Sequence, residues 1–200
     1  YKVYGADGCQ ITTEAAKEIL NEINEIDPFE VERKPFAENE LISFISDDVL
    51  TSFIEEVKKQ SFLYGEKIDK GISVVYTPLN GTGLKPVTRV LKELGYTNVI
   101  TVKEQETPDG NFPTCPYPNP EIREAMELGM QYARMNDADI LIASDPDCDR
   151  VGVAVRDGED YVILNGNQVG VLLLNYICEQ RTKNNDMPES PVLIKTIVTT

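Results

Sequence analysis

Residues 72–83 read Ile-Ser-Val-Val-Tyr-Thr-Pro-Leu-Asn-Gly-Thr-Gly, a short apolar run that passes directly into a turn containing proline and glycine. An apolar run of this length, bounded by turn residues, is typical of a buried strand. After the turn, apolar side chains recur at the spacing of a helix, at Val87, Val90, Leu91 and Leu94. Residues 72–94 therefore predict a strand, a tight turn and a helix in direct succession.

The same alternation continues along the chain. Residues 99–102 and 139–143 are further apolar runs, and a helical pattern over about 120–135 lies between them. A strand-helix-strand-helix-strand order implies a parallel sheet with helices packed on it and right-handed crossovers. Asp157-Gly158 separates two more apolar runs and is a hairpin signal. The predicted fold class is α/β, with a βαβαβ parallel-sheet core, helices on the sheet and an added β-hairpin.

The segments on either side of this core are also patterned. Residues 13–26 predict a helix, and Ser46 is a candidate N-cap for a second helix over the residues that follow it. Residues 167–179 predict an amphipathic helix, and residues 192–198 predict a last strand. Residues 28–45 show no clear period and are interpreted as a connector.

The composition argues against several classes of function. The formal net charge is −15, and this acidity disfavours binding to nucleic acid or to an anionic membrane surface. No run of about 18 apolar residues is present, so no membrane span is expected. The 4 cysteines are widely spaced, which is typical of reduced thiols in a cytoplasmic protein. The absence of histidine excludes His-ligated zinc and a histidine base from these 200 residues.

The strongest chemical signal is Asp145-Pro-Asp-Cys-Asp149, which places three carboxylates at alternate positions directly after an apolar run. Three like charges so close together repel one another unless a cation neutralises them. Carboxylate oxygens are the hard ligands that Mg²⁺ prefers, and loops at strand ends carry the ligands of parallel sheets. The sequence therefore predicts that Asp145, Asp147 and Asp149 bind Mg²⁺.

Other interpretations of this loop compete with a metal site. A solvated acidic turn is the simplest of them. An EF-hand loop starting at Asp145 requires glycine at its sixth place and glutamate at its twelfth, where Arg150 and Arg156 stand, so that interpretation fails. A phosphatase of the haloacid-dehalogenase type also carries Asp-x-Asp after a strand and uses one Asp as the nucleophile, but its motif usually continues with threonine. A phosphatase or phosphotransferase with an Asp nucleophile remains the alternative function, together with a non-catalytic module.

Three features beside the loop have a chemical or structural role to be tested. A guanidinium next to a metal-bound anion can donate two parallel hydrogen bonds to phosphate oxygens, so Arg150 is the candidate catalytic residue. The alternative for Arg150 is an ion pair with a neighbouring aspartate. The backbone amides of residues 81–83 either face a phosphate or form only a turn. Ser144 is expected to satisfy backbone groups of the loop.

Several segments together resemble the α-D-phosphohexomutases, the family of phosphoglucomutases and phosphomannomutases. Thr77-Pro-Leu-Asn-Gly-Thr-Gly83 resembles the Thr-Pro-Leu-His-Gly-x-Gly opening of their second domain, with Asn80 in place of histidine. Asp145-Pro-Asp-Cys-Asp-Arg150 resembles their metal loop, Asp-Pro-Asp-x-Asp-Arg. Further similarities lie in residues 1–10, 109–121 and 164–168, so the resemblance runs in order along nearly the whole chain.

The resemblance implies a four-domain enzyme that interconverts hexose 1-phosphate and hexose 6-phosphate, with glucose favoured and mannose as the other candidate. In this family a phosphoserine donates the phosphoryl group, a hexose bisphosphate reorients, and Mg²⁺ bridges the three aspartates and the phosphoserine. Residues 1–45 would be the tail of domain I, residues 46–165 domain II and residues 166–200 the start of domain III. No serine here lies in the family's phosphoserine motif, so we expect an internal piece that is inactive by itself.

Overall fold

The computed structural model describes residues 3–32, 35 and 42–196. The chain divides into two compact units, Tyr1–Ile45 and Ser46–Thr200. In the first unit, helix α1 (Thr13–Asn24) begins at Thr12, whose side chain accepts a hydrogen bond from the amide of Ala15. The helix predicted over residues 13–26 is therefore present and ends two residues earlier than expected.

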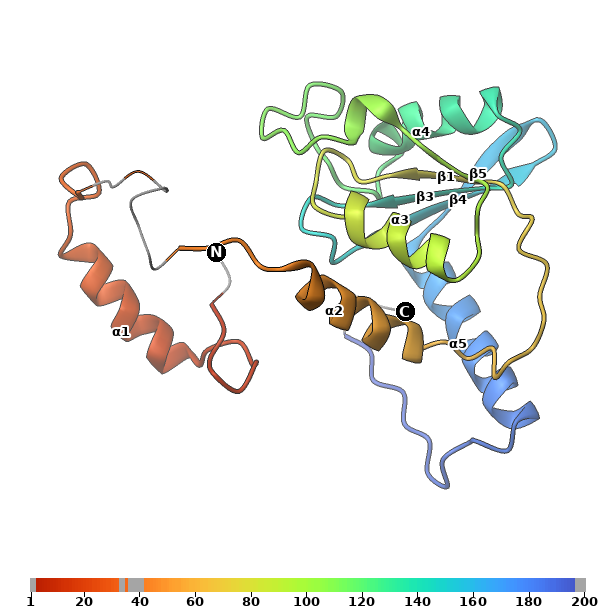
Figure 1. The fold of residues 1–200 in the computed structure, drawn as a ribbon, viewed down its shortest axis with the longest axis horizontal. Helices are drawn as coiled ribbons and strands as arrows, with labels where there is room; N and C mark the ends of the chain where they lie inside the picture. The colour runs from red at the N-terminus through yellow and green to blue at the C-terminus, as the bar shows by residue number, and fades with distance from the viewer. Residues whose placement is uncertain (1–2, 33–34, 36–41, 197–200) are drawn as a thin grey trace. The chain divides into compact units, whose positions relative to one another are not determined.

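The second unit is built on a five-stranded sheet with the order β2-β1-β3-β4-β5. Its strands are β1 (Val74–Thr77), β2 (Val99–Thr101), β3 (Ile140–Ser144), β4 (Val151–Asp157) and β5 (Asp160–Leu164). Strand β1 lies parallel to both β2 and β3, whereas β4 and β5 form an antiparallel hairpin that extends the sheet beyond β3 (Figure 1). The predicted parallel core with an added hairpin is confirmed.

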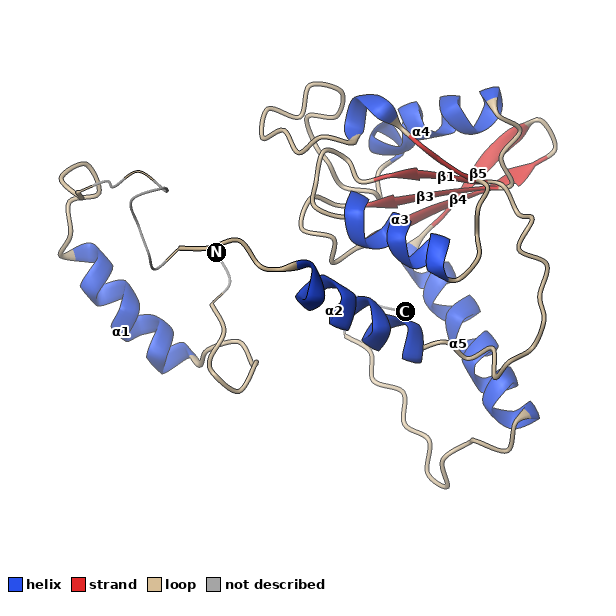
Figure 2. Ribbon diagram, in the orientation of Figure 1, coloured by secondary structure: helices blue, strands red, loops and turns tan. Residues whose placement is uncertain are grey.

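Helices cover both faces of this sheet. Helix α3 (Leu84–Glu93) follows β1, helix α4 (Arg123–Met135) follows β2 and the short 3₁₀ helix η2 (Lys103–Gln105), and Figure 2 shows α3 and α4 on opposite faces. Helix α4 approaches the sheet closely at Gly129, where an added Cβ would lie 2.7 Å from Cδ1 of Leu141. The core between α4 and the sheet is made of small and medium apolar side chains, including Val75, Leu79, Met126, Met130, Leu141 and Ala154.

Two further helices belong to this unit. Helix α2 (Asp47–Lys59) begins after Ser46, as predicted, and Arg89 of α3 donates a hydrogen bond of 2.7 Å to the hydroxyl of Thr51. Helix α5 (Gly166–Lys183) begins with a capping box in which Asn165 and Gln168 bind each other's backbone amides. Among the described residues, no helix has the length and apolar character needed to cross a bilayer.

The strand predicted for residues 192–198 is wrong over residues 192–196, which form no strand. Residues 197 and 198 lie outside the described part of the chain. Val192, Leu193 and Ile194 are all well exposed, at 80%, 65% and 89%. An apolar run alone does not make a strand, because a strand also needs ladder hydrogen bonds to a neighbour.

Candidate metal centre

The candidate site lies at one edge of the sheet. The loop of residues 145–150 begins where β3 ends, and the turn of residues 78–83 begins where β1 ends. Because β1 and β3 are parallel neighbours, with Thr77 opposite Ala143, these two loops leave the sheet side by side. Ligands of open α/β sheets bind outside the carboxyl ends of the strands, so this edge is where chemistry is expected.

The carboxylates of Asp145, Asp147 and Asp149 come together on this edge. One oxygen from each lies within 4.8 Å of the others. Asp145 is buried, whereas Asp147 and Asp149 are exposed. Three hard oxygen donors with this much negative charge suit Mg²⁺, and the exposed pair leaves the outer side of the cluster open to a cation. The residues present therefore fit the metal that the sequence predicted.

Asp145 anchors the loop. Its Oδ1 accepts hydrogen bonds from the amides of Asp149 at 3.0 Å and Arg150 at 2.9 Å, and its Oδ2 accepts one from Nε of Arg150 at 2.9 Å. Burial raises the pKa of Asp145, but the hydrogen bonds from Arg150 outweigh burial and leave this pKa below its ordinary value. Since a carboxylate oxygen accepts about two hydrogen bonds, Oδ1 is already satisfied and Oδ2 is the oxygen left for a metal.

Arg150 forms the ion pair that was the alternative to phosphate binding. Its Nε lies 2.9 Å from Asp145 and 4.0 Å from Asp149, while 48% of its side chain stays exposed. The hydrogen bond to Asp145 raises the pKa of Arg150, so the guanidinium stays charged. Arg150 thus lies at the rim of the carboxylate cluster, and its role towards phosphate stays a prediction.

Several amides of the turn of residues 78–83 bind the protein itself and not a phosphate. The amides of Asn80 and Gly81 donate to the carbonyls of Gln105 and Pro78, each at 2.9 Å. The amide of Thr82 donates to the carbonyl of Pro146 at 2.9 Å, inside the acidic loop. The amides of Gly81 and Thr82 are therefore committed to the protein, and the predicted phosphate contact is wrong for these two. A contact between phosphate and the amide of Gly83 stays a prediction.

Gly81 is the residue that lets the two loops touch. An added Cβ would lie under 3.0 Å from backbone atoms of Pro146, which cannot move aside as a flexible side chain can. We expect Gly81→Ala to lower the free energy of unfolding by about 2 kcal/mol, within the usual range for overpacking. The matched control is Gly110→Ala, because an added Cβ there meets nothing within 4 Å. Chemical denaturation of both variants measures the difference, and equal stabilities would contradict close packing of the loops.

Tyr76 and Asn80 are polar residues behind the site that were not identified as functional from the sequence. The prediction that Ser144 satisfies the loop backbone is wrong, because its Oγ shares a buried hydrogen bond of 2.7 Å with the hydroxyl of Tyr76. Asn80 ties down the next loop, because its Nδ2 donates to the carbonyls of Glu104 at 3.2 Å and Thr107 at 2.9 Å. A tyrosine in a short buried strand was the available signal for the pair of Tyr76 and Ser144, since a buried phenol needs a polar partner.

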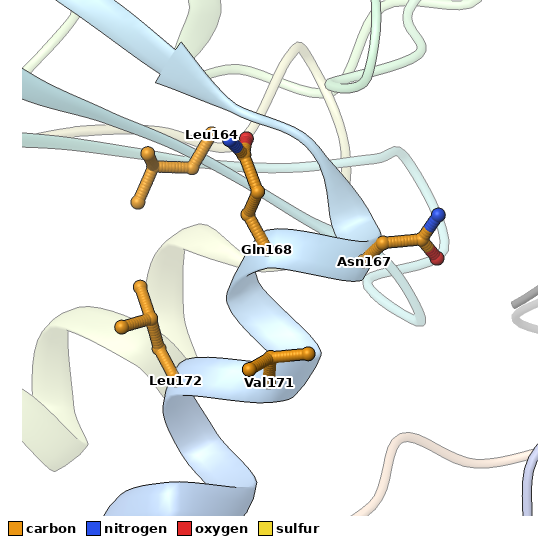
Figure 3. Close-up of a pocket in the computed structure, with 5 residues that line it drawn as sticks. All are labelled: Leu164, Asn167, Gln168, Val171 and Leu172. Atoms are coloured by element: carbon orange, nitrogen blue, oxygen red, sulfur yellow. The ribbon is translucent and has the colours of Figure 1, made fainter. Parts of the chain in front are cut away.

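Two pockets of the second unit differ in whether they reach the acidic loop. An open pocket of about 510 Å³ lies at the start of α5 and is lined by Leu164, Asn167, Gln168, Val171 and Leu172 (Figure 3). Its lining contains no ionisable side chain, so it offers no acid, base or charge to a reaction. A second pocket of about 370 Å³ lies between α2 and α3 and reaches the acidic loop at Asp147 and Cys148.

Comparison with known proteins agrees with this fold. A family model described as phosphoglucomutase/phosphomannomutase, alpha/beta/alpha domain II, matches residues 51–158. The chain is 38% identical to a phosphoglucomutase of Staphylococcus saprophyticus, over 99% of this chain and 36% of that protein. It is 32% identical to a phosphomannomutase of Mycoplasmoides pirum, over 100% of this chain and 36% of that protein.

A solved structure shows the same likeness in three dimensions. The crystal structure of a phosphoglucomutase/phosphomannomutase family protein from Burkholderia thailandensis matches with a TM-score of 0.53 and 25% identity, over 68% of this chain and 26% of that chain. The chain spans about a third of the length of the curated relatives that it matches. The resemblance seen in the motifs is confirmed, and the chain belongs to the phosphoglucomutase/phosphomannomutase family, a family of phosphotransferase enzymes.

Proposed function

We propose that these residues are the metal-binding part of a phosphohexomutase that interconverts hexose 1-phosphate and hexose 6-phosphate. The observation that carries the proposal is the convergence of Asp145, Asp147 and Asp149 at the strand edge of a domain that matches the family's domain II. Glucose is the favoured sugar, supported by the higher identity to a phosphoglucomutase, 38%, than to a phosphomannomutase, 32%. Hexose phosphates and a hexose bisphosphate are the proposed partners.

In this proposal Asp145 through Oδ2, together with Asp147 and Asp149, holds Mg²⁺. The bound ion would supply positive charge that offsets the negative charge of a transferring phosphoryl group. Arg150 would turn its exposed side towards the phosphate, because its Nε is already held by Asp145 and fixes the plane of the guanidinium. The three aspartates, through the ion, and Arg150 would thereby offset the charge of the phosphoryl group and orient it, without forming a covalent bond to the substrate.

The remaining parts of the proposal concern the domain organisation and the cellular location. Residues 1–45 are proposed as the tail of domain I, residues 46–165 as domain II and residues 166–200 as the start of domain III. The phosphoserine would come from elsewhere in a longer protein. A cytoplasmic location is also proposed, supported by four free cysteines that form no disulfide.

The alternative in which Asp145, the first aspartate of the loop, is a phosphatase nucleophile is disfavoured by its burial. A nucleophilic carboxylate must reach phosphorus along an open path. Asp145 has 1% of its side chain exposed and receives three hydrogen bonds. Asp145 is therefore better placed to hold the loop together than to attack phosphorus.

The proposal is tested by comparing the 200-residue chain with a longer protein that contains it. We expect no conversion of glucose 1-phosphate by the 200-residue chain in the presence of Mg²⁺ and a bisphosphate activator, and clear conversion by the longer protein. The reason is that charge neutralisation accelerates only a reaction that already has a nucleophile in line. A coupled assay for glucose 6-phosphate measures both. Turnover by the purified 200-residue chain would favour the aspartate-nucleophile alternative.

A further inference from the structure

Tyr76 is the most unusual side chain behind the acidic loop. It lies in β1 between Val75 and Thr77 and is completely buried. Burial raises its pKa to about 12, which strengthens the preference of the phenol for its neutral form. Placing a hydroxyl in an apolar core costs free energy unless it has a hydrogen-bond partner, and phenylalanine would fill the same space without that cost.

The partner of Tyr76 is the residue that leads into the metal loop. The hydroxyl of Tyr76 and Oγ of Ser144 share a hydrogen bond of 2.7 Å, and both side chains are buried. Ser144 is the last residue of β3, and Asp145 follows it directly. The hydrogen bond therefore joins β1 to the point where the chain leaves the sheet to place its first carboxylate.

Gly83 lies next to the hydrogen bond between Tyr76 and Ser144. An added Cβ at Gly83 would lie 2.6 Å from Oγ of Ser144 and 2.9 Å from Sγ of Cys148, and closer still to the hydroxyl of Tyr76. Three polar side-chain atoms thus meet at one glycine beneath the loop. Cys148 lies between two of the candidate ligands, Asp147 and Asp149, so side chains from both ends of the acidic loop lie near Gly83.

We infer that Tyr76 is a positioning residue for the metal centre, acting through Ser144 to hold the acidic loop in its binding conformation before a cation arrives. This inference rests on the proposed metal site and extends it to a residue that touches neither metal nor substrate. Groups that orient metal ligands from behind typically contribute about 10-fold to 100-fold in metal affinity when they contact a ligand directly. Tyr76 acts one residue further away, so we expect the lower end, roughly 10-fold.

The test measures Mg²⁺ binding directly. The 200-residue chain is titrated with MgCl₂ at constant ionic strength, and the NMR signals of the amides of residues 145–150 report the dissociation constant. Tyr76→Phe is compared with the double variant Tyr76→Phe/Ser144→Ala, because removing both partners leaves no buried hydroxyl unpaired and keeps the fold. Both variants are expected to bind Mg²⁺ about 10-fold more weakly than the wild-type chain, while the melting temperature of the double variant stays close to that of the wild type.

Tyr161→Phe is the matched control. Tyr161 is also buried, and its hydroxyl donates to the carbonyls of Ala133 and Ala138, at the opposite edge of the sheet from the acidic loop. We expect this variant to lose stability without any change in Mg²⁺ affinity. Unchanged Mg²⁺ affinity in both Tyr76 variants, or an equal loss in Tyr161→Phe, would overturn the positioning role. A wild-type chain that gives no saturable response to MgCl₂ would instead overturn the metal site itself, and the inference with it.

Discussion

Asp147→Asn is expected to abolish Mg²⁺ binding by the 200-residue chain and to lower kcat/KM of the longer enzyme by about 1,000-fold. The size follows from the several kcal/mol of transition-state charge stabilisation that a bound divalent ion supplies. Asp147 is more informative than Asp145 because it is exposed, whereas Asp145 also holds the loop together. Its replacement by an isosteric amide should therefore remove a ligand and leave the fold in place.

Stability measurements separate metal binding from folding in this variant. In metal-free buffer we expect the free energy of unfolding of Asp147→Asn to be equal to or above that of the wild type, because one of three clustered negative charges is gone. Added MgCl₂ should raise the melting temperature of the wild type by mass action and leave the variant unchanged. Thermal unfolding with and without MgCl₂ checks both expectations.

The charge change itself needs a control. Asp157 is exposed at the hairpin between β4 and β5, away from the acidic loop in sequence, and Asp157→Asn removes the same charge. This variant should respond to MgCl₂ as the wild type does. If Asp147→Asn retains the wild-type response, Asp147 is not a ligand. If Asp157→Asn loses it as well, the response reports net charge and not a bound ion.

The parallel core was predictable because its signals are local. Each strand appears as a short apolar run and each helix as a 3.6-residue period, and a run such as residues 139–143 was displaced by only one residue in the structure, to Ile140–Ser144. The acidic loop was equally visible, because its three carboxylates lie within five consecutive residues. A site formed by neighbours in sequence needs no knowledge of the packing.

What supports the site was not predictable, because it depends on pairs far apart in the chain. Tyr76 and Ser144 are separated by 68 residues and meet only because β1 and β3 are neighbours in the sheet. The sequence reveals the period of each strand but not which hydroxyl of one strand faces which hydroxyl of the next. The same limit explains residues 192–196, whose apolar character indicated a strand although pairing with a neighbour decides whether one forms.

Asn80→Asp is expected to destabilise the chain by about 4 kcal/mol. Asn80 is 5% exposed, and its Nδ2 donates to two backbone carbonyls, those of Glu104 and Thr107. In the variant a carboxylate oxygen would face both carbonyl oxygens, so two hydrogen bonds become repulsions and a charge is buried without a partner. Leaving buried groups unsatisfied costs about 1–3 kcal/mol each, and an uncompensated buried charge costs more.

The family resemblance makes Asn80 the natural place for this test, because histidine is usual there and a chemical role would otherwise be assumed. In the structure Asn80 instead holds both ends of the loop over 104–109, because its backbone carbonyl also accepts a hydrogen bond from the amide of Asp109 at 3.2 Å. Its φ of 57° lies in the left-handed region, which asparagine and aspartate both tolerate. The substitution therefore changes the hydrogen bonding without adding backbone strain.

Asn185→Asp is the control for this prediction. Asn185 has a φ of 53°, like Asn80, but its side chain is exposed. The same chemical change should shift the free energy of unfolding there by no more than about 0.5 kcal/mol. Urea denaturation at pH ~7 measures both variants against the wild type, and hydrogen exchange of the amides of residues 103–109 locates the loss. A cost below about 1 kcal/mol for Asn80→Asp would mean that the Nδ2 hydrogen bonds do not hold this loop, because a single neutral hydrogen bond already contributes that much.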